Sequence, residues 1–154
     1  MAYAMHWNYI MTLEEILEEW GKDSHINHNS LSDESLRIPK LHHKYYSMLV
    51  QERLRLAKMR ASFDERIDLL EQWLDGQLDS ETLKQHNLEV QRKMLTKVER
   101  EKKLNLLPEV VQGKLKNALQ QEKVDALESI IKTFQNRGYI IRTALDWQRL
   151  QMGG

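Results

Sequence analysis

Basic side chains gather in two blocks of the 154-residue chain, although its formal net charge is zero. Residues 40–60 carry six lysines and arginines against one acid, and residues 91–103 carry six against two. By contrast, residues 12–36 hold seven acids against one base, and residues 61–90 hold eight against two. Basic blocks of this kind can contact phosphates, while acidic blocks can face a basic partner. The alternative is that these are solvated helix faces whose charges pair within the chain.

Other residues that could do chemistry form no recognisable site. The chain has no cysteine, which excludes disulfides, thiolate metal ligands and cysteine nucleophiles. Asp23 with His25 and His28, or the adjacent His42 and His43, could contribute to a metal site, but a divalent metal needs three or four converging ligands. There is no glycine-rich phosphate loop and no evident Ser/His/Asp arrangement. We therefore expect a protein without enzymatic activity, metal or cofactor.

Four aromatic residues in helical segments admit two interpretations. They could stack on nucleotide bases, or they could be core residues, as aromatics at helical spacing more often are. These residues are Trp20, Tyr45, Tyr46 and Trp73.

The elements that must position these residues are helices, and we expect an all-α chain. Only two prolines and six glycines interrupt the sequence, and apolar positions recur at helical spacing. The expected helices span about 12–20, 39–75, 80–103 and 108–150. Residues 22–38 are rich in Asp, Ser, Asn and His, so they are expected to be mostly loop, with a short helical turn at 32–36 as an option.

Single residues predict the helix boundaries. The T-x-x-E pattern at Thr12 indicates a capping box, and Gly21 is the expected end of the first helix. Pro39 suits the first turn of the second helix, which Gly76 ends. Pro108 disfavours helical geometry at the residue before it, so it should separate the third helix from the fourth.

The long helices need partners for their apolar stripes. A helix of roughly 55 Å cannot bury its own stripe, which predicts coiled-coil-like packing in this chain and against copies of it. Gly138 lies on the apolar side of the fourth helix, where a glycine usually marks a close approach, here by a helix of another subunit. The predicted oligomerisation residues are Leu127, Ile130, Ile131, Phe134, Gly138, Ile141 and Leu145.

Four segments carry a resemblance to a known family. They read "MTLEEILEEWGKDSHI", "SLRIPKLHHKYYSML", "QWLDG" and "LESIIKTFQNRGYIIRTALDWQRL". In this order they resemble the UvsY family, the recombination mediator proteins of T4-like phages. The resemblance begins at Met11 and is strongest over residues 12–49 and 126–150.

The resemblance implies a small, all-helical, non-enzymatic protein that works in the host cytoplasm. Family members form closed homo-oligomers of six or seven subunits through their C-terminal helices. They bind single-stranded DNA, the phage single-strand-binding protein and the recombinase, and they help the recombinase load onto coated strands. The alternative function is a helical coiled-coil scaffold that does not bind DNA.

The resemblance also implies a basic strand-binding segment just before the aromatic-glycine turn. The matching stretch here, "ERIDLLEQWLDG", keeps Arg66 but has Asp68 and Glu71, so most of the positive charge lies earlier, in residues 53–60. The predicted strand-binding residues are Lys40, Lys44, Arg53, Arg55, Lys58, Arg60, Arg66, Arg92, Lys93 and Lys97.

The expected organisation divides one structural unit into three stretches. Residues 1–11 form an N-terminal extension, residues 12–107 bind nucleic acid and partners, and residues 108–154 form the oligomerisation helix. The first ten residues, "MAYAMHWNYI", have no counterpart in the resemblance. They are either an upstream extension from start-codon choice or a hydrophobic arm that docks on a neighbour.

Overall fold

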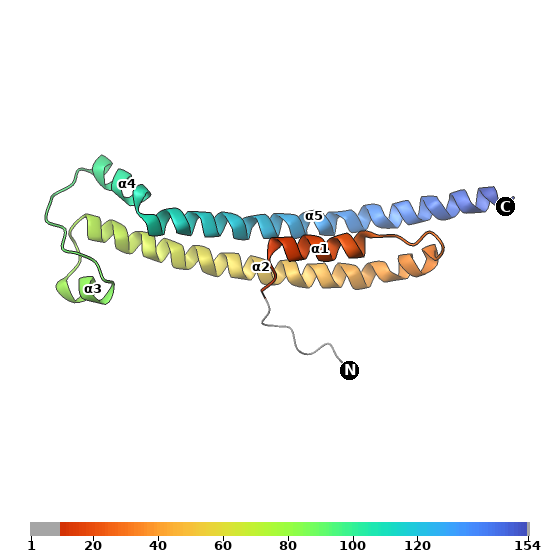
Figure 1. Cartoon of the computed structure of the whole chain (residues 1–154), viewed down its shortest axis with the longest axis horizontal. Helices are drawn as coiled ribbons and strands as arrows, with labels where there is room; N and C mark the ends of the chain where they lie inside the picture. The colour runs from red at the N-terminus through yellow and green to blue at the C-terminus, as the bar shows by residue number, and fades with distance from the viewer. Residues whose placement is uncertain (1–9, 154) are drawn as a thin grey trace, which may run out of the picture. The chain divides into compact units, whose positions relative to one another are not determined.

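The computed structural model describes residues 10–153, and this part of the chain consists of helices and their connections (Figure 1). The helices are α1 (Leu13–Ser24), α2 (Leu31–Leu74), α3 (Ser80–Gln85), α4 (Lys97–Leu106) and α5 (Pro108–Gln151). The predicted all-α class is confirmed. Of the first ten residues only Ile10 is described, so the predicted extension or arm lies almost wholly outside the described residues.

Helix α1 begins as predicted and ends later than predicted. The Glu15 N–H donates to Thr12 Oγ1 (3.2 Å) and the Thr12 N–H donates to Glu15 Oε2 (2.7 Å), so the capping box is confirmed. The predicted end at Gly21 is wrong, because α1 continues to Ser24. Gly21 is an exposed helical residue, and the helix ends where the backbone of His25 becomes extended.

Helix α2 begins eight residues earlier than predicted, at Leu31. The Glu34 N–H donates to the Ser30 carbonyl (3.1 Å), and Leu31 and Glu34 are both buried. Pro39 therefore lies inside the helix rather than in its first turn. It removes the bond to the Ser35 carbonyl, but both residues are exposed, so water can replace that bond. The predicted loop is confirmed for residues 25–30 and the optional helical turn at 32–36 is present, but the loop prediction is wrong for the other residues from 31 to 38, where burial stabilises the first part of the helix.

The end of α2 agrees with the prediction. Gly76 adopts φ +73°, a left-handed conformation that glycine enters without a Cβ clash. Its N–H donates to the Trp73 carbonyl (3.1 Å), and the Gln77 N–H donates to the Gln72 carbonyl (3.0 Å). These bonds satisfy carbonyls at the helix end and turn the chain out of α2.

The predicted third helix, 80–103, is wrong, since the structure has two short helices there. Helix α3 ends before His86, and Asn87 adopts a left-handed conformation with φ 53°. A second capping box, between Thr96 and Glu99, then starts α4. Residues 86–96 between them are a non-helical loop.

Helix α5 matches the predicted fourth helix closely. Leu107 has the extended conformation expected of a residue that precedes a proline, and α5 begins at Pro108. Proline is well suited to this first helical position because its missing N–H would have no partner there.

The chain forms two compact units. The first unit comprises residues 10–53 and 122–153 of the described chain, and the second comprises residues 54–121, so α2 and α5 pass through both. In the first unit, Trp20 packs edge-on against Tyr45 and Phe134, with ring centroids 5.4 and 5.6 Å apart. Tyr45 has no exposed surface.

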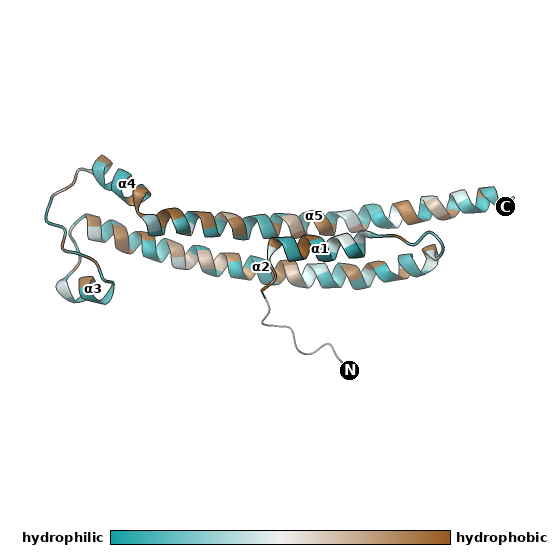
Figure 2. Cartoon of the chain, viewed as in Figure 1, coloured by the Kyte–Doolittle hydropathy of each residue, from teal (hydrophilic) through white to brown (hydrophobic). Residues whose placement is uncertain are grey.

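The second unit has its own apolar core. Leu70 and Leu74 of α2 pack with Leu104 of α4 and Val110 of α5. The apolar residues of each long helix alternate with polar ones along its length (Figure 2). Both units therefore bury one side of α2 and α5 and leave another side for charged groups.

Candidate nucleic-acid interface

Lys44, one of the predicted strand-binding residues, is held by carboxylates within the first unit. Its Nζ lies 2.5 Å from Glu19 Oε1 and 2.6 Å from Asp23 Oδ2. The Tyr45 hydroxyl (3.1 Å) and Arg37 Nη2 (2.7 Å) also donate to Asp23. Burial acts to raise the pKa of Asp23, but the hydrogen bond and charge of Lys44, aided by these two donors, bring that pKa below its ordinary value. The charge of Lys44 is thus matched inside the fold.

Arg137, to which the sequence pattern assigned no role, is 5% exposed. Its Nη1 donates to the carbonyls of Asp23 (3.2 Å) and Ser24 (2.9 Å), and its Nη2 donates to the carbonyl of His25 (3.0 Å). These are carbonyls at the end of α1, so the guanidinium caps that helix. Nη2 also lies 2.8 Å from Glu34 Oε2.

The carboxylate of Glu34 depends on this arginine. Burial acts to raise the pKa of Glu34, but a backbone N–H donated by Asn27 and the hydrogen bond and charge of Arg137 outweigh it and lower that pKa. Glu34 is therefore a carboxylate at neutral pH, and its ion pair with Arg137 ties α2 to α5 in the first unit.

The other predicted strand-binding residues of the first unit differ in their surroundings. Arg53 pairs with Glu128, with Nη2 and Oε1 2.5 Å apart. Lys40 is exposed and has no ion pair within the described residues. Of the three predicted cations in this unit, only Lys40 lacks an acidic partner there.

In the second unit, basic residues of α2 and α5 line a shallow groove, which we call the α2–α5 groove. It has a volume of about 420 Å³. Lys58, Ser62 and Arg66 stand at intervals of four along α2, so they share one face of the helix. Apolar and polar side chains of both helices complete the lining, which is Lys58, Met59, Ser62, Phe63, Arg66, Gly113, Lys116 and Asn117.

Gly113 is what lets the Phe63 ring lie against α5. A Cβ added to Gly113 would lie 2.3 Å from Phe63 Cε2 and 2.5 Å from Cδ2, which is far inside contact distance. The ring therefore occupies space that any other residue at this position would fill. The tight approach between these helices occurs here rather than at Gly138, where the nearest atom to an added Cβ is Ile38 Cδ1 at 3.8 Å.

The basic residues of the groove and its neighbourhood are only partly neutralised. Arg66 makes two hydrogen bonds to Glu109, at 2.7 and 3.2 Å. Arg60 donates to the amide oxygen of Gln121 (2.8 Å), which leaves its charge unmatched there. Lys58 and Lys116 are exposed and form no ion pair in the described part of the chain. Arg55 is half-buried and already engaged with another group.

A second basic cavity, which we call the loop pocket, is formed by the 86–96 loop and α4. Its lining is Leu88, Glu89, Val90, Gln91, Arg92, Lys93, Leu95 and Lys103. Arg92 has no ion pair among the residues described, and Lys93 is 3.9 Å from Glu99. Both are predicted strand-binding residues, and both line this cavity.

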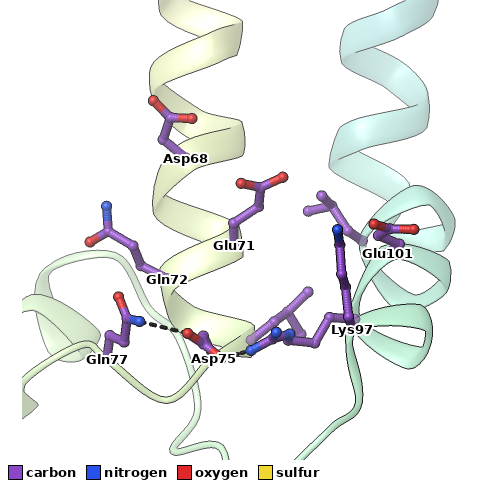
Figure 3. Close-up of a pocket in the computed structure, with 10 residues that line it drawn as sticks. Asp68, Glu71, Gln72, Asp75, Gln77, Lys97 and Glu101 are labelled. Carbon is purple, nitrogen blue, oxygen red and sulfur yellow. Dashed lines mark hydrogen bonds and ion pairs between the residues drawn. The ribbon is translucent and has the colours of Figure 1, made fainter.

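Lys97, the remaining predicted strand-binding residue, faces a different environment. It lines a pocket of about 390 Å³ between the end of α2 and α4, together with Asp68, Glu71 and Glu101 (Figure 3). In this pocket Asp75 accepts a hydrogen bond from Gln77 and pairs with Arg100. Lys97 thus stands among acids, whereas all charged residues of the groove, and all but Glu89 in the loop pocket, are basic.

The lining of the basic cavities includes two lysines and an asparagine that were not among the predicted strand-binding residues. Lys116 and Asn117 line the groove from α5, and Lys103 lines the loop pocket from α4. Only Lys103 fell in a basic block that the sequence revealed. The "GKLKN" stretch offered a signal for the other two, because it places lysines beside a helical glycine in an apolar stripe.

The aromatic residues mostly serve the cores. Tyr45 and Trp20 pack in the first unit, and Trp73 packs against the apolar cluster of the second. Tyr46 is half exposed and stacks on His42, with ring centroids 5.8 Å apart and an interplanar angle of 10°. Of the two interpretations, the one as core residues therefore applies to Trp20, Tyr45 and Trp73.

Most of the predicted oligomerisation residues are covered by their own chain. Leu127, Ile130, Phe134 and Ile141 are no more than 4% exposed. Ile131, Gly138 and Leu145 are partly exposed. The stripe thus closes the first unit, and the apolar side chains that α5 leaves exposed near its C-terminus are Tyr139, Ile140, Trp147 and Leu150.

The described residues offer neither a metal site nor a membrane span. No group of three or more His, Cys, Asp or Glu residues is placed to hold a metal ion there. None of the described helices combines the length and apolar character of a membrane span.

The comparison with protein families decides the family. Residues 19–154 match the model for UvsY, described as a recombination, repair and ssDNA binding protein. The chain belongs to the UvsY family. The matched region includes both the α2–α5 groove and the loop pocket, and the resemblance inferred from the sequence is confirmed.

Solved structures of a UvsY protein have the same fold. Two crystal structures of the bacteriophage T4 recombination mediator protein UvsY, lattice types IV and II, align with TM-scores of 0.79 and 0.80. Each is 17% identical, and the alignments cover 91% and 93% of this chain and 99% of each T4 chain. Comparison with curated proteins gives no match.

Proposed function

We propose that this chain is a phage recombination mediator that binds single-stranded DNA in the α2–α5 groove. In this role it acts by binding alone, in the host cytoplasm. It promotes loading of the recombinase onto strands that are coated by the single-strand-binding protein. The observation that carries the proposal is a groove lined by basic residues from two helices, in a member of a family described as ssDNA binding.

The groove suits a phosphate backbone better than a folded partner. Lys58 and Lys116 approach it from opposite helices with no acid paired to them among the described residues. Arg66 is partly offset by Glu109, so it can exchange that partner for a phosphate. Phosphate contacts of this kind bind strands with little regard to sequence, which is what a mediator requires.

We further propose that the chain acts as a homo-oligomer of six or seven copies. The exposed side chains Tyr139, Ile140, Trp147 and Leu150 of α5 offer an apolar surface for a neighbouring copy. Several grooves in one assembly would bind one strand together, so the effective concentration of each site rises and weak single sites suffice.

Salt-dependent binding to labelled oligothymidylate, followed by fluorescence anisotropy, tests the strand site. Replacing Lys58 and Lys116 by alanine should weaken binding and reduce the slope of log affinity against log salt by about 0.7 for each lost phosphate contact. Lys132→Ala is the matched control, because Lys132 is an exposed lysine of α5 in the first unit. Native mass spectrometry of the same proteins gives the number of copies.

If the folded Lys58→Ala/Lys116→Ala variant kept the salt slope of the unmodified protein, the groove would not be a strand-binding site. Salt-insensitive behaviour of the unmodified protein would favour the alternative function, a helical scaffold without DNA binding. Arg53 and Lys44 were also predicted to bind the strand, but they are held by Glu128 and by Glu19 and Asp23. We expect their replacement to lower stability more than strand affinity.

A further inference from the structure

The loop pocket is fixed to the core of the second unit, so its basic groups have defined positions. Leu88 and Leu95 of the loop pack against the apolar cluster that includes Leu70 and Leu74. Trp73 Nε1 donates to the Glu89 carbonyl at 2.6 Å. Apolar packing therefore fixes the loop to the core both before and after its basic residues, and a hydrogen bond adds to this before them.

Three basic side chains converge on this pocket against one acid. Arg92 and Lys93 come from the loop, and Lys103 comes from α4. Lys103 Nζ is 5.6 Å from the centroid of the Trp73 ring, so a cation–π contact holds it in place. Glu89 is the only acidic residue in the lining.

The loop backbone adds further donors for an anion. In the part of the chain that the structure describes, the N–H groups of residues 90–94 donate to no backbone carbonyl. Gln91 Nε2 donates to the Lys93 carbonyl (3.2 Å), which shapes the turn between them. Free N–H groups beside basic side chains are typical of sites that bind phosphate oxygens.

The loop pocket is attached to α2 one helical stretch beyond the α2–α5 groove, through the bond from Trp73 to the Glu89 carbonyl. Trp73 follows Arg66 by seven residues, so the two side chains leave α2 on nearly the same face. Seven residues of helix advance the chain by about 10 Å. A strand that leaves the groove past Arg66 along α2 therefore reaches the pocket within the same unit.

We propose that the loop pocket is a second strand site, which binds phosphates of nucleotides adjacent to those in the groove. This inference rests on the proposed function. An acidic peptide would also suit the charge and the N–H donors, but the shared face with Arg66 favours a strand. The pocket thus lengthens the footprint of each subunit on DNA and adds to its salt dependence.

Strand length separates the two sites experimentally. Binding is measured with oligothymidylates of about 4 and about 16 nucleotides, the range of footprints found among single-strand binders. The variant Arg92→Ala/Lys93→Ala should bind the short strand as the unmodified protein does. It should bind the long strand more weakly, with a salt slope smaller by about 1.4 for two lost contacts. The groove variant Lys58→Ala/Lys116→Ala should be weakened for both lengths.

The control variant is Arg92→Lys/Lys93→Arg, which keeps the charge and should keep long-strand affinity. Circular dichroism verifies that each variant remains helical. Unchanged long-strand affinity and slope in the alanine variant, with the groove variant still defective, would overturn the inference and leave the proposed function intact. Absence of strand binding by the unmodified protein would overturn both.

A labelled oligoglutamate peptide tests the other ligand class. We expect it to bind weakly and to be displaced by the long strand. If the alanine variant lost peptide binding but kept full affinity for the long strand, the pocket would be a peptide site and the inference would be wrong.

Discussion

The two units differ in how far their basic residues are paired with acids. The first unit has 10 lysines and arginines and 12 acids, and the second has 13 and 11. In the first, Lys44, Arg53 and Arg137 are bound to carboxylates, and one of these pairs is buried. In the second, Lys58, Lys116 and Arg92 have no acidic partner among the described residues. Composition therefore does not decide which basic residues can bind a ligand; the carboxylates placed opposite them in the fold do.

The largest effect should come from breaking the buried pair of the first unit. Arg137→Met would leave Glu34 in the interior with only the Asn27 N–H (3.3 Å) and Arg37 Nη1 at 3.9 Å, and the last carbonyls of α1 without the arginine donor. Removing one partner of a buried ion pair costs about 3–5 kcal/mol. Urea denaturation followed by circular dichroism measures this loss. Arg142→Met on the same helix is the control, since Arg142 is exposed and unpaired within the described residues, and it should change stability little.

Acid should weaken the same unit to a smaller degree. The pKa values of Asp23 and Glu34 are lowered in the fold, so their stabilising contribution is present above the ordinary carboxyl pKa of about 4 and is lost as the pH falls below it. Protonation leaves side-chain shape and the α1 cap in place, which is why the loss is smaller than for Arg137→Met. Melting temperatures between pH 7 and pH 2.5 measure it. A melting temperature that stays flat across this range would contradict the ionic account of this unit.

In the second unit, the sensitive position should be the glycine under the aromatic ring. Gly113→Ala forces the Phe63 ring to move, because the new Cβ would lie 2.3 Å from it. Overpacking of this kind costs about 1–3 kcal/mol. Thermal denaturation measures the cost, and Phe63→Leu in the alanine background should recover part of it by removing the ring.

The smallest effect should be a gain, not a loss, of stability. Gly138→Ala meets only Ile38 Cδ1 at 3.8 Å, which is ordinary contact. Alanine is favoured over glycine inside a helix by about 1 kcal/mol, so we expect a slight gain in stability. A clear loss, or a smaller assembly by light scattering, would show that a neighbouring subunit approaches Gly138 as the sequence predicted.

The sequence predicted the fold well where the signal was local. The box at Thr12, the glycine at the end of α2 and the proline that begins α5 each act on adjacent residues, and each was predicted correctly. The same pattern recurs at Thr96 and Glu99 but was missed, because sparse apolar residues suggested a helix running through the loop. Asn87 was a second missed signal, since asparagine tolerates the left-handed conformation that ends α3.

The candidate site was harder to predict because its determinants are distant in sequence. Lys44 and Lys58 both belong to the first basic block, yet the acids that hold Lys44 lie 21 and 25 residues away, whereas Lys58 has no such partner among the described residues. Lys116 joins the groove only because α5 returns alongside α2 in the second unit. The residues adjacent to each lysine in the sequence do not distinguish Lys44 from Lys58 and Lys116.

The cap that Arg137 places on α1 has a consequence for the order in which the chain folds during synthesis. The carbonyl of Ser24 receives its donor from a residue 113 positions later. A helix of 12 residues has marginal stability by itself, and the contact between Trp20 and Phe134 forms only after Phe134 has been made. At 5–20 residues per second, a ribosome needs roughly 5–20 s to make the intervening chain. The first helix to be translated therefore gains its C-terminal cap only after most of α5 has been made, and nascent chains that lack α5 leave that end of α1 open to chaperones.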